Sequence, residues 1–195
     1  MENISCAHND RPLFNIKIRW ILTVIVIISC SFIFKGFIIR QLLNRAISYY
    51  GFGMYNDAIR EYQKVLLMEH DNEEALNWMG YSYKVSGRYP EAIKVYKEAI
   101  SFNPKNYFAY LDLGLIYLDE GKIRKAKDTF YQVSLIDTQN IGVNEGDLSF
   151  NYKMCLHWLA KLQSETDEAN EAIGTYKLIL KYDPDDKRAK TRLKE

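Results

Sequence analysis

The stretch GYSYKVSGRYPEAIKVYKEA, residues 80–99, decides the fold. Its apolar and small residues recur at helical spacing in two runs, and Gly87 separates the runs. This pattern predicts two helices joined by a tight turn. Gly80 and Ala92 lack bulk and allow the two helices to approach each other closely, while Tyr96 provides a large apolar surface for burial.

The pattern repeats along the chain at a spacing of 34 residues. Positions 76–104 align with positions 110–138, and the same register extends upstream to Leu42. Downstream, the register returns after about a dozen additional residues. Four units are therefore expected, at 39–72, 73–106, 107–140 and 153–186.

Small, aromatic and turn-forming residues mark equivalent positions in these units. They are Leu76, Gly80, Tyr83, Gly87, Ala92, Tyr96 and Pro104 in the second unit, with counterparts that include Gly114, Tyr117, Gly121, Ala126 and Phe130 in the third. In this period the residues resemble the tetratricopeptide repeat (TPR) family over about residues 39–186. The resemblance implies an all-α TPR solenoid, a right-handed superhelix of helix pairs whose concave groove binds a peptide or another protein.

The junction between the third and fourth units departs from the repeat. Residues 140–146 predict a loop, and Asp147 is expected to N-cap a lengthened helix, so that 141–152 form an inserted loop and helix extension. The terminal sequence KRAKTRLKE, residues 187–195, has the length and polarity of a short helix. We expect it to cap the last apolar face, as solenoids require for solubility, with its basic residues in solvent.

The N-terminal region contains an uncharged apolar run at residues 20–34, directly after Arg19. As a helix this run is about 22 Å long, shorter than the hydrocarbon core of about 30 Å, and continuing to Ile39 supplies the missing length. Lys35 then lies near one end, where its ammonium can reach the interface. We expect a short tail at 1–17 and a single membrane-spanning helix at 18–39.

Two alternatives compete with a retained span. Residues 27–30 resemble a bacterial lipobox that ends at Cys30, which would then be lipidated, and a cleaved secretory signal is the other alternative. The residues after Cys30 stay apolar, which favours the span. Lys17 and Arg19 adjoin the apolar start, so we expect a single-pass protein with a cytoplasmic N-terminus and the TPR domain on the opposite side.

In the TPR family the first helix of each pair lines the groove. The matching positions, which we predict to form the partner-binding groove, are Leu43, Ile47, Tyr50, Asn77, Tyr81, Lys84, Leu111, Leu115, Leu118, His157 and Lys161. This lining is mostly apolar, which favours a partner segment with an apolar or helical face. Alternatively, the third unit's leucines pack under the inserted loop. Lys84 and Lys161 either meet acidic residues of a partner or are solvated.

Three further features of the sequence bear on what the expected groove binds. Leu43 and Ile47 stand where the Lys and Asn set that clamps a C-terminal carboxylate in some TPR domains would begin, so that activity is not expected. Trp78 and Trp158 occupy the same place in two units and either pack between helices or anchor a partner. The basic residues at positions 122–127 fall on a second helix, which indicates a convex, solvated face.

Several function classes lack support in the sequence. The formal net charge is only +1, without the basic patch that nucleic-acid binding requires. The three cysteines lie in separate segments, the histidines are isolated, and no catalytic or phosphate-binding motif is present. We therefore expect no metal, no cofactor, no small-molecule substrate and no enzymatic activity, and we expect Cys155 to be a small buried residue.

These patterns together predict a membrane-anchored scaffold or adaptor that binds partner proteins through a TPR groove. Two other functions fit the same residues. One is a constitutive structural subunit of a membrane complex, and the other is a lipoprotein, acylated at Cys30, that assists assembly of another complex.

Overall fold

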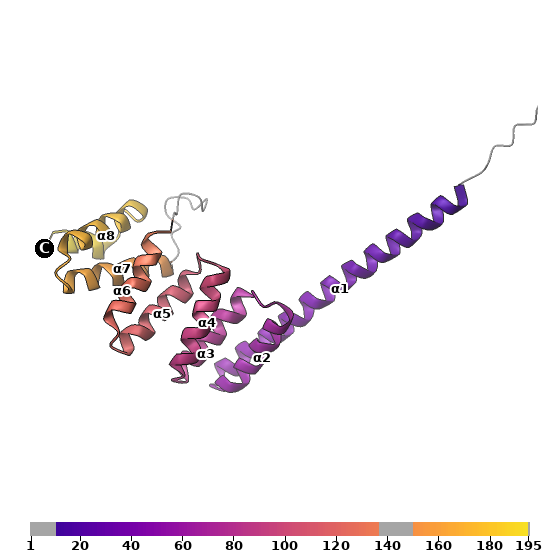
Figure 1. Cartoon of the computed structure of the whole chain (residues 1–195), viewed down its shortest axis with the longest axis horizontal. Helices are drawn as coiled ribbons and strands as arrows, with labels where there is room; N and C mark the ends of the chain where they lie inside the picture. The colour runs from indigo at the N-terminus through magenta and orange to yellow at the C-terminus, as the bar shows by residue number, and fades with distance from the viewer. Residues whose placement is uncertain (1–10, 137–149, 195) are drawn as a thin grey trace, which may run out of the picture.

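The computed structural model describes residues 11–136 and 150–194, and every regular element in this part of the chain is an α-helix (Figure 1). The helices are α1 (Arg11–Gly51), α2 (Tyr55–Met68), α3 (Glu73–Val85), α4 (Tyr89–Phe102), α5 (Tyr107–Asp119), α6 (Ile123–Ser134), α7 (Phe150–Glu165), α8 (Ala169–Tyr182) and α9 (Lys187–Arg192). Each helix packs against the next in the chain, so the four pairs stack into a solenoid. The predicted all-α solenoid is confirmed.

Glycines in the left-handed backbone conformation form the turn inside three of the pairs. Gly53, Gly87 and Gly121 have φ angles of 73°, 75° and 70°. In each turn the next residue donates its N–H to a carbonyl five residues back, as Arg88 does to Tyr83 at 2.9 Å. The fourth pair uses Asp167 with φ 58° in the same role. This short turn makes the two helices of a pair antiparallel.

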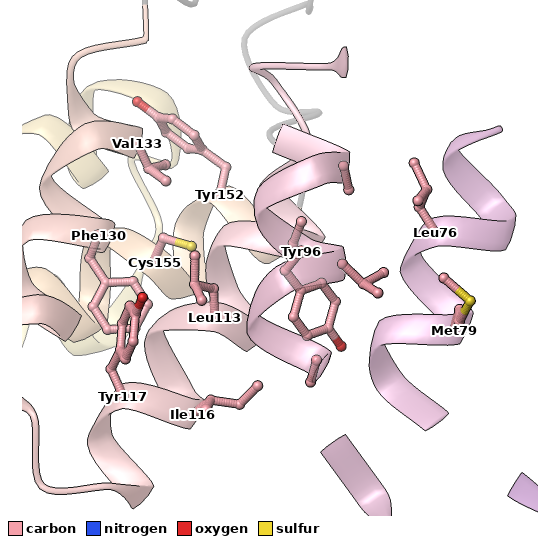
Figure 2. Close-up of a cluster of buried hydrophobic side chains, with 14 of the residues drawn as sticks. Leu76, Met79, Tyr96, Leu113, Ile116, Tyr117, Phe130, Val133, Tyr152 and Cys155 are labelled. Carbon is pink, nitrogen blue, oxygen red and sulfur yellow. The ribbon is translucent and has the colours of Figure 1, made fainter. Parts of the chain in front are cut away.

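Two other glycines are required because the helices of a pair approach each other closely. A Cβ atom on Gly80 would lie 2.7 Å from the ring of Tyr96, and one on Gly114 would lie 2.3 Å from the ring of Phe130. Both rings are fully buried, and Figure 2 shows them among the apolar side chains that join successive helices. The close approach predicted at Gly80 is confirmed.

The first helices of later pairs begin at capping side chains. The N–H of Ala75 donates to Oδ1 of Asn72, and the N–H of Ala109 donates to Oδ1 of Asn106, each at 3.0 Å. Asp186 caps α9 in the same way. These caps satisfy backbone donors at the start of α3, α5 and α9. The shared cap places α9 where the first helix of another pair would begin.

Helix α1 has two halves with different surroundings. Side chains from Trp20 to Phe37 are largely exposed, while Ile39, Leu42 and Ala46 are buried beneath α2. The exposed half projects away from the solenoid (Figure 1). The helix runs without a break from Arg11 to Gly51, across both residue 17 and residue 39. No interruption of the backbone therefore separates the expected tail, span and first unit.

The region between α6 and α7 is described only in part. The expected loop at 140–146 and the expected cap at Asp147 lie outside the described residues. Residues 150–152 belong to α7, which begins at Phe150. Tyr152 is buried there against Tyr107 of α5, with ring centroids 4.9 Å apart. The start of α7 thus packs on the preceding first helix.

Candidate partner-binding surface

The first helices of the pairs form one layer of the solenoid. Helix α3 contacts α5, and α5 contacts α7, whereas contacts between the second helices α2, α4, α6 and α8 are fewer in the described part of the chain. Because α3, α5 and α7 are closer together than the second helices, we infer that the stack bends with the first helices on its inner side. We call the solvent-facing surface of α1, α3, α5 and α7 the inner face.

An aromatic cluster occupies the N-terminal part of the inner face. The ring of Tyr50 lies 5.5 Å from Trp78 and 5.7 Å from Tyr81, and Tyr81 lies 6.3 Å from Phe108. All four rings are half-buried. Burial first, and the neighbouring Tyr81 second, raise the pKa of Tyr50 to about 12, so its hydroxyl is neutral near pH 7. The cluster therefore offers large, uncharged rings to solvent.

A buried ion pair lies directly beside this cluster. Nζ of Lys84 lies 2.5 Å from Oδ1 of Asp112, and the hydroxyl of Tyr96 donates to Oδ2 of the same carboxylate at 3.2 Å. The side chains of Lys84 and Asp112 are 18% and 9% exposed. The ammonium also lies 5.7 Å from the centre of the Tyr81 ring. The interaction ties α3 and α4 to α5 and neutralises the cation.

Leucines follow the aromatic cluster on α5. Leu111 and Leu118 are half-buried and pack against the apolar core. Leu115 is half-buried as well, but it is not part of that packing. Ile47 on α1 is 40% exposed. Leu115 and Ile47 are therefore apolar side chains of the inner face that the core does not use.

A cavity of about 510 Å³ lies at the C-terminal end of the inner face. Helix α7 provides most of its wall, and Tyr176 of α8 and two arginines of α9 complete it. The lining residues are Met154, His157, Trp158, Lys161, Ser164, Glu165, Tyr176, Arg188 and Arg192. The ring of Trp158 stacks on Phe130 with an interplanar angle of 14°. Helix α9 thus closes one side of a partly aromatic cavity.

Asp186 links the cavity wall to the start of α9. Its carboxylate accepts from the N–H of Ala189 at 2.8 Å and lies 3.1 Å from Nε2 of His157. Burial raises the pKa of Asp186, but these two hydrogen bonds and the charge of Lys153 together hold it below its usual value. His157 is therefore engaged in docking α9, although its side chain lines the cavity.

Comparison with known proteins identifies the repeat. A model described as "TPR repeat" matches residues 80–121, and a model described as "Tetratricopeptide repeat" matches residues 109–140. The matches begin within α3 at Gly80 and continue through α4, α5 and α6, so they include both Gly80 and Gly114. The chain is a tetratricopeptide repeat protein. The predicted family is confirmed.

Curated relatives of this TPR chain differ widely in length. It is similar to Photosystem I assembly protein Ycf3 of Synechococcus sp. (strain CC9605), at 30% identity over 104 residues, 48% of this chain and 60% of that protein. It is also similar to human cilia- and flagella-associated protein 70, at 37% identity over 73 residues, 36% of this chain and 6% of that protein. The chain thus spans less than two thirds of the length of either relative.

Solved structures share the fold of this TPR chain. MamA superposes with a TM-score of 0.57 at 22% identity, covering 81% of this chain and 80% of that one. The Yersinia enterocolitica type III secretion chaperone SycD, in complex with a peptide of the translocator YopD, gives a TM-score of 0.55 at 18% identity, covering 65% and 93%. At these identities the likeness concerns the fold.

Three residues predicted to line the TPR groove are engaged in contacts within the solenoid. Leu43 is only 8% exposed, because α2 covers the side of α1 on which it lies, so the prediction that it faces a partner is wrong. Lys84 is on the inner face, but Asp112 holds its ammonium, so it is not freely solvated. A contact between Lys84 and a carboxylate of a partner stays a prediction. Asn77 accepts a hydrogen bond from Nδ2 of Asn106 at 2.8 Å and helps to join α3 to α5.

The remaining predicted residues fall into two groups. Tyr50 and Tyr81 belong to the aromatic cluster, near Leu111, Leu115 and Leu118, while His157 and Lys161 line the cavity at the far end. Trp78 and Trp158 both pack on neighbouring rings and stay half-buried. The residue spacing of the TPR pattern predicts which side chains belong to the first helices and point towards the inner face. It does not predict which of these side chains a neighbouring helix buries.

Sequence reasoning missed the contribution of α9 to the cavity. Arg188 and Arg192 were expected to solvate the cap, and both line the cavity together with Met154. The spacing from Asn106 to Asp186 carried a signal, because it equals twice the repeat length plus the insertion, and both residues cap a first helix of the repeat pattern. Treating α9 as the first helix of a further TPR pair identifies these arginines.

Basic residues of α6 are used within the molecule. Nζ of Lys127 lies 2.5 Å from Glu168, and Nζ of Lys122 lies 2.9 Å from Glu120. The ammonium of Lys125 lies 5.8 Å from the centre of the Tyr117 ring. Lys122, Lys125 and Lys127 are therefore engaged within the molecule and are not simply solvated as the sequence predicted.

One of the described helices is long and apolar enough to cross a membrane. This is α1 from Trp20 to Gly51, with a mean hydropathy of 2.4 in its most apolar window. A signal sequence near the N-terminus meets the same criteria of length and apolar composition. Cys30 lies on the exposed half of this helix, and Cys155 is buried, as expected. Among residues 11–136 and 150–194, no group of His, Cys, Asp and Glu side chains is arranged to hold a metal ion.

Proposed function

We propose that this TPR protein is a membrane-anchored adaptor. It holds a segment of a partner protein on the inner face and serves the assembly of a membrane-associated complex. The observation that carries the proposal is the division of α1. One half is apolar and exposed, from Trp20 to Phe37, and the other half packs as the first helix of the solenoid.

The dimensions of the exposed half support a membrane anchor. At 1.5 Å per residue it is about 27 Å long, close to the thickness of the hydrocarbon core. Nζ of Lys35 lies 3.5 Å from Oε1 of Glu69 at the end of α2. The solenoid therefore begins beside the end of the anchor, and the continuous helix holds it close to the membrane surface.

The inner face supports the binding of a polypeptide. Its rings and leucines are partly exposed and uncharged, and such surfaces in otherwise soluble domains mark protein contacts. A similarity to a relative named as an assembly protein agrees with a role in assembly. No acid, base and nucleophile are brought together among the described residues of this surface, so we propose binding and not catalysis.

Affinity capture from detergent-solubilised membranes tests the proposed groove. Ile47→Asp with Leu115→Asp places two charges on the inner face without touching the core packing. The matched control is Tyr131→Asp on α6, which is 47% exposed on a second helix. We expect the inner-face variant to lose a partner that the control retains, with unchanged circular dichroism. If both variants recover the partner equally, the partner contacts another surface. This result would favour a constitutive subunit that binds its neighbours through surfaces other than the inner face.

Membrane flotation and the intact mass of the purified protein test whether α1 is a membrane anchor. The proposal predicts that the chain stays with membranes in alkaline carbonate and that its mass includes residues 20–39. A mature chain that begins after this region indicates a cleaved signal. A diacylglycerol adduct on Cys30 indicates the lipoprotein alternative, which keeps the inner face but replaces the anchor.

A further inference from the structure

The cavity at the end of the inner face carries more positive than negative charge. Lys161 and Arg188 are two cations of its lining, and Glu165 is the only carboxylate among its lining residues. Nζ of Lys161 lies 3.9 Å from Oε1 of Glu165, and both side chains are more than half exposed, so this contact neutralises the site only weakly. The carboxylate of Asp186 lies behind His157 and is already engaged by His157 and Lys153. An anionic group that enters the cavity therefore meets a lining with more positive than negative charge.

The base of the cavity is apolar and rigid. Trp158 is held by stacking on Phe130 and is half-buried, and Met154 lies one turn away on the same helix. The ammonium of Lys161 lies 4.8 Å from the centre of the Trp158 ring. The volume of about 510 Å³ accommodates a few side chains, not a whole domain. An apolar side chain fits against the indole, with charged groups beside it.

The middle of the inner face, on α3 and α5, lacks this charge. On α3 the cation is Lys84, and Asp112 already neutralises it. The middle of the surface presents Tyr81 and Leu115. The inner face is thus apolar in its centre and positive at its C-terminal end, so it distinguishes the two ends of a bound segment.

We propose that the cavity between α7 and α9 binds an acidic segment of a partner protein. The carboxylates of the segment pair with Lys161 and Arg188, and an adjacent apolar side chain packs on Trp158. This inference rests on the proposed function, because it names the kind of segment that the inner face takes. Recognition uses side-chain carboxylates and does not need a free chain end.

The test uses the full chain in detergent and a short fluorescent peptide with both ends capped. In the peptide, glutamates flank a central phenylalanine, and its matched analogue has glutamine in place of every glutamate. Fluorescence anisotropy at low salt measures binding. We expect the acidic peptide to bind at least about tenfold more tightly than the analogue, and its affinity to fall as salt screens the charges.

Charge reversal locates the site. Arg188→Glu and Lys161→Glu are each expected to weaken binding by about tenfold or more. Lys190→Glu is the matched control, because this residue lies on the same helix but does not line the cavity. Equal affinity for the neutral analogue, or an equal loss with Lys190→Glu, overturns the proposal. Thermal unfolding of each variant separates lost binding from lost folding.

Two outcomes assign the cavity differently. In the first, the wild type does not bind the peptide but forms a dimer, and Arg188→Glu converts this dimer to a monomer. This result would mean that a second copy of the chain occupies the cavity, and it would overturn the inference. If Ile47→Asp with Leu115→Asp abolishes partner capture while the acidic peptide fails to bind, the proposed function stands and the acidic partner is wrong.

Discussion

At the scale of single residues, the tightest constraint is the contact between Gly114 and Phe130. An added methyl group would lie 2.3 Å from the Phe130 ring, so Gly114→Ala is expected to lower the free energy of unfolding by about 1–3 kcal/mol. Gly174→Ala is the control, because its Cβ meets nothing within 4 Å, and it is expected to add about 0.5–1 kcal/mol. Urea unfolding of the two variants measures both effects.

The cause of this loss is itself testable. Combining Gly114→Ala with Phe130→Leu removes the ring that clashes, so the double variant should be less destabilised than the sum of the two single changes. Strict additivity of the two losses would mean that the methyl group and the ring do not meet.

The Lys84–Asp112 pair is the second residue-scale feature. Lys84→Met leaves a nearly buried carboxylate with only the Tyr96 hydroxyl, and we expect a loss of about 2–3 kcal/mol in unfolding free energy. Lys97→Met on the exposed side of α4 is expected to change it by less than about 0.5 kcal/mol. Adding Asp112→Asn to Lys84→Met should recover part of the loss, and no recovery would argue against a charge effect.

At the scale of elements, the docking of α9 depends on an ionised Asp186. The pKa of this carboxyl is held below 3.8, so its contribution to stability is fully present above that value and is lost as pH falls through the folded-state pKa. Asp186→Asn keeps the capping oxygen but removes the charge. The difference in melting temperature between wild type and this variant should therefore be largest near pH 6 and shrink towards pH 3.

A pH-independent difference would contradict this account of α9. It would mean that the carboxylate acts through its shape and hydrogen bonds alone. Circular dichroism at several pH values between 3 and 7 makes the comparison, with Asp185→Asn as the exposed control.

Elements also differ in how far the sequence predicts them. The helix–turn–helix pairs were predictable, because glycine turns such as Gly87 and close contacts such as Gly80 recur at a fixed spacing. The burial of Leu43 was not, because the repeat pattern does not specify which side of α1 is covered by α2. Nor was the role of Arg188, which meets α7 only after the chain has turned through α8.

At the scale of the whole molecule, one continuous helix joins two environments. The exposed apolar half of α1 ends where Lys35 pairs with Glu69, and packing under α2 begins at once with Ile39. The chain therefore has no flexible linker between the proposed anchor and the solenoid. An adaptor with this continuous helix holds its inner face at a fixed orientation relative to the membrane.

The central claim is that a partner lies on the inner face, and site-specific photocrosslinking in intact membranes tests it most directly. A benzophenone amino acid replaces Leu115 on the inner face or Tyr131 on α6, one position at a time. The account predicts a discrete adduct with another protein from position 115 and none from position 131. Adducts from position 131 alone, or equally from both positions, would contradict recognition by the inner face.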